Sequence, residues 1–262
     1  MIYMKSILYK IYKSDNKQAS QDIYDLYKSK WQVLVNYIYG ANIIRNDLFE
    51  NQTSKPLKQI LLDGDFILPD GAALRTFWRF GYIFGGLDVV GMGMPDTLHN
   101  INGTDFLPYM IHDYVAKVGK DKVKLVIYGS QKAFQPKICK YIDDNFGVEL
   151  LYILDGYSDF DWSKLPKINS DNIYIFIVAR GTPLQEIWSY ENRDKLSGFI
   201  VMNQGGTMDF WAWFETRAPR RIRVLRLESI YRLITKPKKN FAKFMTSFLM
   251  MWEIVKRWIL RR

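Results

Sequence analysis

One short turn combines residue types that can carry chemistry: Pro69-Asp70-Gly71. Proline fixes φ and glycine frees it, so such a turn holds the Asp70 carboxylate in a defined position. A carboxylate there can take the proton from an acceptor hydroxyl as a general base. The alternative is a turn aspartate that hydrogen-bonds its own backbone.

A second segment, Gly181-Thr-Pro-Leu-Gln-Glu, reads as a turn followed by a helix. Gly181 and Pro183 predict the turn, and Gln185 and Glu186 fall in the first helical turn. Main-chain amides at a helix start attract phosphate, so the amide of Gln185 can meet a uracil, ribose or phosphate group. A capped helix start, with Glu186 placed favourably for the helix dipole, explains the same residues.

A third glycine turn, Gly205-Gly-Thr-Met-Asp-Phe, places Asp209 beyond a further apolar run. It either shapes a ligand pocket or caps a helix.

The elements that must position these segments are apolar runs of strand length. They cover residues 31–40, 66–68, 123–130, 148–156, 172–181 and 198–206, with helices predicted over 134–147 and after Pro183. The first 30 residues show no clear periodicity. The alternation predicts an α/β fold, a Rossmann-like, mostly parallel sheet with helices on both faces. Because ligands bind beyond the carboxyl ends of such strands, the three loops should gather at one edge.

The charge of the chain is concentrated at its end. Residues 217–262 contain 14 Lys and Arg and two Glu, a net charge of +12, whereas the rest carries −2. We therefore divide the chain into an α/β domain (1–215) and a basic C-terminal appendage (216–262). Such a tail favours an anionic partner: nucleic acid, a phospholipid surface or a diphosphate substrate.

The last part of the tail predicts an amphipathic helix that lies on a membrane surface. One helical face carries Phe241, Phe244, Met245, Phe248, Trp252, Val255 and Ile259. Basic residues flank this stripe, so residues 236–262 suit an anionic lipid surface better than a nucleic-acid backbone. A helix packed on the same chain or on a second copy, in a homo-oligomer, is the alternative. The sequence contains no apolar stretch long enough for a transmembrane helix.

Taken together, four segments resemble the WecG/TagA/CpsF glycosyltransferases, a bacterial family that makes surface polysaccharides and teichoic acid linkage units. They are PDG (69–71), NGTDF (102–106), GTPLQE (181–186) and the run from GGTMDF to TRAPRRIRVLRLESIYRLITKP (205–237). The resemblance covers about residues 31 to 240. Asn36 matches the asparagine of a family Thr-x-Asn motif, and Asn100 stands where the family often has an arginine.

The resemblance implies inverting, metal-independent transfer from a UDP-sugar to a polyprenyl-diphosphate-linked sugar. Asp70 matches the catalytic base, and Gln185 matches an active-site glutamine. The remaining implied substrate contacts are Asn36, Gly71, Asn100, Gly181, Pro183, Glu186 and Asp209, with Arg217, Arg221 and Arg232 reaching the diphosphate from the tail. The enzyme would be cytoplasmic, peripheral on the inner face of the cell membrane.

Other function classes remain open at this stage. Some glycosyltransferases hold a divalent metal with an Asp-x-Asp motif, and the chain has two such strings, Asp63-Gly64-Asp65 and Asp159-Phe160-Asp161. Neither clearly ends a strand, so we interpret both as loop acids and expect neither metal nor cofactor. A single cysteine, Cys139, and two histidines disfavour zinc and disulfides. A nucleic-acid-binding protein and an inactive glycosyltransferase-like scaffold are the further alternatives.

Overall fold

The computed structural model describes residues 7–39, 56–71, 74–75, 78–79, 97–214, 218–219, 221–222 and 228–235, and the single positions 237, 241, 245 and 252. Its centre is one sheet of six parallel strands in the order β2-β1-β6-β5-β3-β4. The strands are β1 (Val33–Ile38), β2 (Phe66–Pro69), β3 (Val123–Gly129), β4 (Glu149–Leu154), β5 (Ile173–Ala179) and β6 (Phe199–Asn203). The predicted α/β fold with strands in these regions is confirmed.

The described helices lie before, between and after the strands. They are α2 (Asn16–Lys30), α4 (Leu57–Asp63), α6 (Gly103–Val118), α7 (Gln135–Phe146), α8 (Leu184–Glu191), α9 (Gly206–Trp211) and α11 (Glu228–Thr235). Short 3₁₀ helices cover Lys120–Lys122, Lys132–Phe134, Trp162–Lys164 and Arg193–Leu196. The predicted helices over 134–147 and after Pro183 correspond to α7 and α8.

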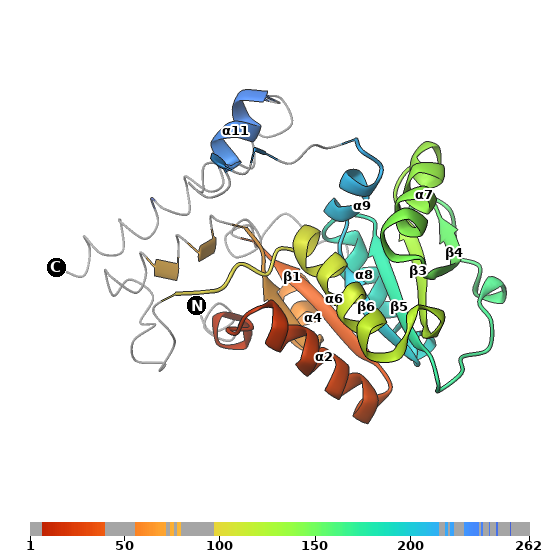
Figure 1. Ribbon diagram of the computed structural model, residues 1–262. Helices are drawn as coiled ribbons and strands as arrows, with labels where there is room; N and C mark the ends of the chain where they lie inside the picture. The colour runs from red at the N-terminus through yellow and green to blue at the C-terminus, as the bar shows by residue number, and fades with distance from the viewer. Residues whose placement is uncertain are drawn as a thin grey trace.

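The helices that connect two strands lie on the faces that right-handed crossovers require. The connections β1-α4-β2 and β5-α8-β6 move toward the β2 edge, and α4 packs against α8 on one face. The connections through α6 and α7 move the opposite way, and these helices pack with α2 and α9 on the other face. Figure 1 shows α2, α6 and α7 in front of the sheet, with α4 and α8 behind it.

Two apolar cores result, one on each face. The larger core joins the α2, α6, α7 and α9 side chains to alternate strand residues such as Val35, Ile127 and Ile177. The smaller core contains Tyr128, Phe176 and Val201 and is closed by aromatic side chains of the β4–β5 connection and α8. Burial on both faces explains why the central strands are continuous apolar runs rather than alternating ones.

Helix α2 differs from the prediction, because residues 16–30 form a helix of four turns. Asp15 caps it by accepting a 2.9 Å hydrogen bond from the Gln18 amide. The buried face consists of Ala19, Ser20, Ile23 and Tyr27. Because Ala19 is small and Ser20 is polar, the buried face of this helix is only weakly apolar, and the helical periodicity of the sequence is therefore hard to recognise.

The C-terminal appendage is described only in part. Helix α11 and a few neighbouring positions are described, and Phe241 and Trp252 are both more than half exposed. Most of the predicted apolar stripe lies outside the described residues. The division at residue 215 therefore stays a prediction.

Candidate functional site

The loops singled out by sequence follow strands that end at the same edge of the sheet. Asp70 follows β2, Gly181 follows β5 after Arg180, and Gly205 follows β6 after Gln204. Since all strands are parallel, these positions share the carboxyl edge, as predicted. Asn100 and the N-terminus of α6 reach the same edge, because Ile101 donates a 3.0 Å hydrogen bond to the carbonyl of Pro69.

The Asp70 turn is held from two sides. The Asp70 amide donates a 2.8 Å hydrogen bond to the Ile38 carbonyl of β1. The Gly71 amide donates a 3.0 Å bond to Oδ1 of Asn100, and Gly71 has a φ of +90°, which favours glycine. The half-buried Asp70 carboxylate is therefore carried on a main chain that is fixed to β1 and to the segment before α6.

Tyr37 adds a phenol beside this turn that the sequence analysis did not identify. It pairs with Leu68 across β1 and β2, and Asp70 follows two residues later on the same face. Burial, and then the negative charge of Asp70, raise the pKa of Tyr37 well above its usual value. Its buried hydroxyl has no hydrogen-bond partner within the described part of the chain. The alternation of side chains along β1 was the available signal.

The side chain of Gln185 is directed into the protein. It is 4% exposed, and its Nε2 donates to the Asn203 carbonyl at 3.0 Å. Its Oε1 accepts a 3.1 Å bond from the Gly181 amide, and its own amide donates to the Gly181 carbonyl at 3.1 Å. Gln185 thus joins the β5 and β6 loops. The Thr182–Pro183 peptide bond of this loop is cis.

Glu186 lies deeper still and is fully buried. One carboxyl oxygen accepts hydrogen bonds from the Gln185 side-chain amide at 2.9 Å and from the Thr182 hydroxyl at 3.0 Å. Burial raises the pKa of Glu186 to about 7, although these hydrogen bonds act in the opposite direction. Glu186 therefore supports the loop from inside, and a direct contact with substrate stays a prediction.

A chain of buried polar groups continues from here to β1. The Ser189 hydroxyl donates to Oδ1 of Asn203 at 2.5 Å, and the Asn203 amide donates to Oδ1 of Asn36 at 2.7 Å. Asn36 is fully buried, and a Cβ on Gly64 would lie 2.4 Å from its Nδ2. Asn36 is placed below the edge, within the sheet, rather than on the surface of the site.

The β6 loop lies between the other two loops. A Cβ on Gly205 would lie 3.3 Å from the Gly181 nitrogen, and one on Gly103 would clash with the Gln204 side chain. A helix, α9, does start in this segment, with Asp209 in its first turn, and a contact of Asp209 with substrate stays a prediction. Of the tail arginines, Arg221 is exposed, whereas Arg217 and the side chain of Arg232 lie outside the described residues.

An open cleft adjoins the Asp70 turn. Its volume is about 350 Å³, and it is lined by Asp15, Asn16, Lys17, His99, Asn100 and Tyr109. Since Asn100 also binds Gly71, the cleft lies directly beside the turn. His99 is part of this lining, whereas His112 packs edge-on against Phe146.

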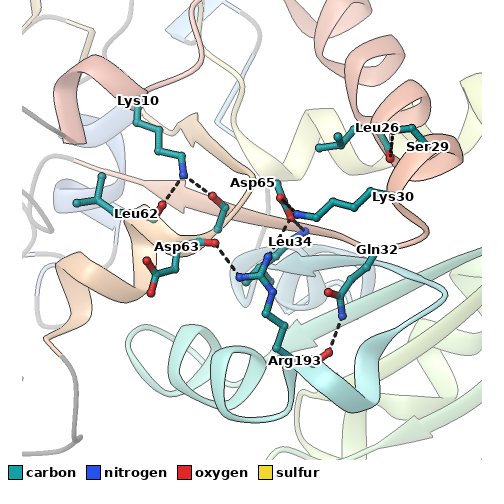
Figure 2. A network of polar contacts seen from close by, with 11 residues as sticks. Lys10, Leu26, Ser29, Lys30, Gln32, Leu34, Leu62, Asp63, Asp65 and Arg193 are labelled. Carbon is teal, nitrogen blue, oxygen red and sulfur yellow. Dashed lines mark hydrogen bonds and ion pairs between the residues drawn. The ribbon is translucent and has the colours of Figure 1, made fainter.

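The first Asp-x-Asp string lies at the opposite edge of the sheet. Asp65 precedes β2, where it accepts a 2.8 Å bond from the Leu34 amide and pairs with Lys30. Figure 2 shows this network, in which Lys10 binds the Leu62 carbonyl and Arg193 donates to the Asp63 carbonyl. These acids are therefore distant from the carboxyl edge. The loop-acid interpretation is confirmed for Asp65 but is wrong for Asp63, which is the last residue of α4.

In the second Asp-x-Asp string, residues 159–161, one acid has a structural role. Asp161 caps the 3₁₀ helix that follows it. Among the residues that the structure describes, no three His, Cys, Asp or Glu side chains form a group that could bind a metal. Over the same residues, no helix has both the length and the apolar content that crossing a bilayer demands.

Arg180 is a further polar residue at the carboxyl edge that was not among the candidates from sequence. It follows β5 directly, and its Nε donates a 2.9 Å hydrogen bond to the Gly156 carbonyl in the β4 loop. Its guanidinium lies 5.0 Å from the centre of the Tyr128 ring. Sequence placed Arg180 inside the predicted strand 172–181, and a basic residue near the end of an otherwise apolar run was the available signal.

Comparison with known proteins gives two findings. A family model described as "Glycosyl transferase WecG/TagA/CpsF family" matches residues 6–262, so most of the first 30 residues, which the sequence analysis placed outside the resemblance, are included. One similar protein is the N-acetylglucosaminyldiphosphoundecaprenol N-acetyl-beta-D-mannosaminyltransferase of Bacillus spizizenii. It is 25% identical over 207 residues, which cover 77% of this chain and 74% of the relative.

Proposed function

Since the chain belongs to the WecG/TagA/CpsF family and is therefore a glycosyltransferase, we propose that it transfers a sugar from a UDP-sugar to a polyprenyl-diphosphate-linked sugar. The name of the Bacillus relative supports an N-acetylglucosaminyl-diphosphate lipid as the acceptor class. The donor class follows from the family resemblance. The observation that carries the proposal is the Asp70 turn, which presents a carboxylate at the carboxyl edge beside an open cleft.

In this mechanism Asp70 removes the proton from the acceptor hydroxyl as the oxygen attacks the anomeric carbon of the donor. The new bond forms on the face opposite the leaving UDP, so the configuration at that carbon is inverted. The cleft beside Asn100 is the natural place for the acceptor sugar, because it offers amide, carboxylate and ammonium groups with Tyr109 as an aromatic surface.

We further propose that fixed positive charge, rather than a metal ion, balances the leaving diphosphate. Arg217, Arg221 and Arg232 in the basic segment are the candidate cations. The position of Asp63 and Asp65 at the opposite edge disfavours the metal-dependent alternative, because these carboxylates are distant from Asp70 and one of them is paired with Lys30.

The enzyme is proposed to act on the inner face of the cell membrane, held there by residues 236–262. The exposure of Phe241 and Trp252 supports this, since aromatic side chains beside basic ones suit a bilayer interface. Removing residues 236–262 should abolish sedimentation with anionic vesicles. Full binding and full activity of that truncated chain would contradict the membrane role.

The test of the function is a transfer assay with short-chain polyprenyl-diphosphate N-acetylglucosamine and a panel of UDP-sugars, in the presence of EDTA. Transfer from one of these donors, with inversion at the anomeric carbon, is the expected result. Transfer that appears only when a divalent metal is restored would contradict the metal-independent mechanism. No transfer from any donor would favour the inactive-scaffold alternative.

A further inference from the structure

Arg180 is a half-buried cation whose orientation is fixed without any acid. Its Nε is bound to the Gly156 carbonyl, and its guanidinium packs over the Tyr128 ring. None of the described carboxylates forms an ion pair with it. Asp155 in the neighbouring loop is instead bound by the amide and hydroxyl of Ser158. The remaining guanidinium N–H groups have no hydrogen-bond partner among the described residues, so they can donate to a ligand.

The position of Arg180 is where parallel α/β sheets bind ligands. The chain leaves β3 toward α7 on one face and leaves β5 toward α8 on the other. The ends of these two strands therefore form the switch point, whose crevice is where parallel α/β sheets bind ligands. The strand ends approach closely here. A Cβ on Gly129 would lie 2.3 Å from the Ala179 carbonyl group, and one on Gly156 would lie 3.3 Å from the Gly129 Cα.

Buried hydrogen-bonding capacity at this crevice is also left unused. Ser130, directly after β3, has a φ of +72°, a region that non-glycine residues rarely adopt. Its hydroxyl is buried and has no hydrogen-bond partner in the described ranges. Strained residues of this kind cluster at ligand sites, and Ser130 lies beside β5, since its amide donates to the Ala179 carbonyl.

The distance between Asp70 and the end of β5 indicates which part of the donor would lie beside Arg180. β2, which carries Asp70, and β5 are three strand spacings apart in the sheet, about 14 Å. The base must be within about 3 Å of the acceptor hydroxyl, and that oxygen within about 3.5 Å of the reacting carbon. The diphosphate is bonded to this carbon through one oxygen, so it belongs near the ends of β1 and β6. The ribose and base extend farther, toward β5 and β3.

We propose that Arg180 binds the nucleobase of the donor, donating hydrogen bonds to a carbonyl oxygen of its pyrimidine ring. This rests on the proposed function, which supplies the uracil nucleotide. The guanidinium has only donors, and the uracil carbonyl groups are acceptors. The contacts with Gly156 and Tyr128 hold the donors in place before the ligand arrives, and Ser130 offers a second polar group at the same crevice.

The test measures binding of uridine, UMP and UDP to the full chain by ligand-observed NMR and calorimetry. Arg180→Gln should weaken all three ligands by a similar factor, about tenfold or more, because hydrogen bonds from a charged group are lost. Arg180→Lys should weaken them as well, since lysine lacks the planar fork. The control is Arg193→Gln, the same change at the opposite edge, which should leave all three affinities unchanged.

Two results would overturn this assignment. One is weaker UDP binding with unchanged uridine binding, which would make Arg180 a phosphate contact. The other is unchanged binding of all three ligands by both Arg180 variants. If Arg180→Gln does not fold, Arg180→Lys carries the same comparison. Failure of the proposed function would look different, because the wild-type chain would then bind no uridine nucleotide and transfer no sugar.

Discussion

The side-chain amide of Gln185 donates a 3.0 Å hydrogen bond to the main-chain carbonyl of Asn203. This bond joins the first turn of α8 to the end of β6, so two loops of the candidate site are fixed relative to each other. The same amide binds Glu186, and the Asn203 side chain binds Asn36 of β1. The ends of β1, β5 and β6 are thus connected by buried polar groups beneath the site.

Because of Glu186, the free energy of unfolding should decrease as pH rises. Its pKa is about 7 in the folded chain against 4.5 ordinarily, so between these values the unfolded chain loses a proton that the folded chain keeps. The free energy of unfolding should therefore decrease as pH rises from 4.5 to 7, by about 3 kcal/mol, and level off above. In Glu186→Gln this contribution should vanish. Urea denaturation at pH 5 and pH 8 tests it, and equal pH dependence in both proteins would refute it.

The buried pair Asn36 and Asn203 should show strong coupling. Asn203→Leu leaves Asn36 and Ser189 buried without their partner, and should cost about 2 kcal/mol or more of unfolding free energy. In the Asn203→Leu variant, the further change Asn36→Leu should cost less unfolding free energy than the same change costs in the wild-type protein. The reason is that Asn36 has already lost its partner in that variant, so its replacement removes an unpaired buried group. A double-mutant cycle measured by denaturation checks this. Strictly additive losses would mean that the hydrogen bond contributes nothing.

Gly129 should tolerate no side chain, whereas Gly119 should tolerate one at a moderate cost. Both have positive φ, but a Cβ on Gly129 meets the Ala179 backbone and one on Gly119 meets nothing within 4 Å. Gly119→Ala should therefore show backbone strain alone, about 1–3 kcal/mol. Gly129→Ala should lose at least twice as much or fail to fold. Similar melting temperatures for the two variants would contradict the close approach of β3 and β5.

Asp65 should matter for stability and not for chemistry. Asp65→Ala removes the acceptor of the Leu34 amide and the partner of Lys30, and should lower the unfolding free energy by about 1–2 kcal/mol. At a temperature where the variant is folded, kcat should be unchanged and transfer should proceed equally with and without EDTA. A loss of kcat that added divalent metal restores would instead give the Asp-x-Asp string a catalytic role.

Much of the fold could be predicted from the sequence, because strands buried on both faces of a sheet are short continuous apolar runs, rich in β-branched and aromatic residues and bounded by turn residues. The gathering of the Asp70 and Gly181 loops at one edge followed from the parallel arrangement alone. Helix α2 was missed because Ser20 faces the interior, where its hydroxyl binds Asp113.

The role proposed for Arg180 could not be predicted from sequence, because it depends on β5 lying between β6 and β3. Strand order is a tertiary property, and so is the buried direction of Gln185. The sequence identified the first turn of α8 as important but could not show which of its groups point inward.

The most direct test of the account compares Asp70→Asn with wild type in single-turnover transfer, using saturating donor and lipid-linked acceptor in EDTA. The amide keeps the shape of the carboxylate but cannot accept the proton, so the rate should fall by about 100-fold or more while UDP affinity is unchanged. Asp65→Asn, the same change at the opposite edge, should retain the wild-type rate. An Asp70→Asn enzyme that transfers sugar at the wild-type rate would show that Asp70 is not the base and that the assignment of the site is wrong.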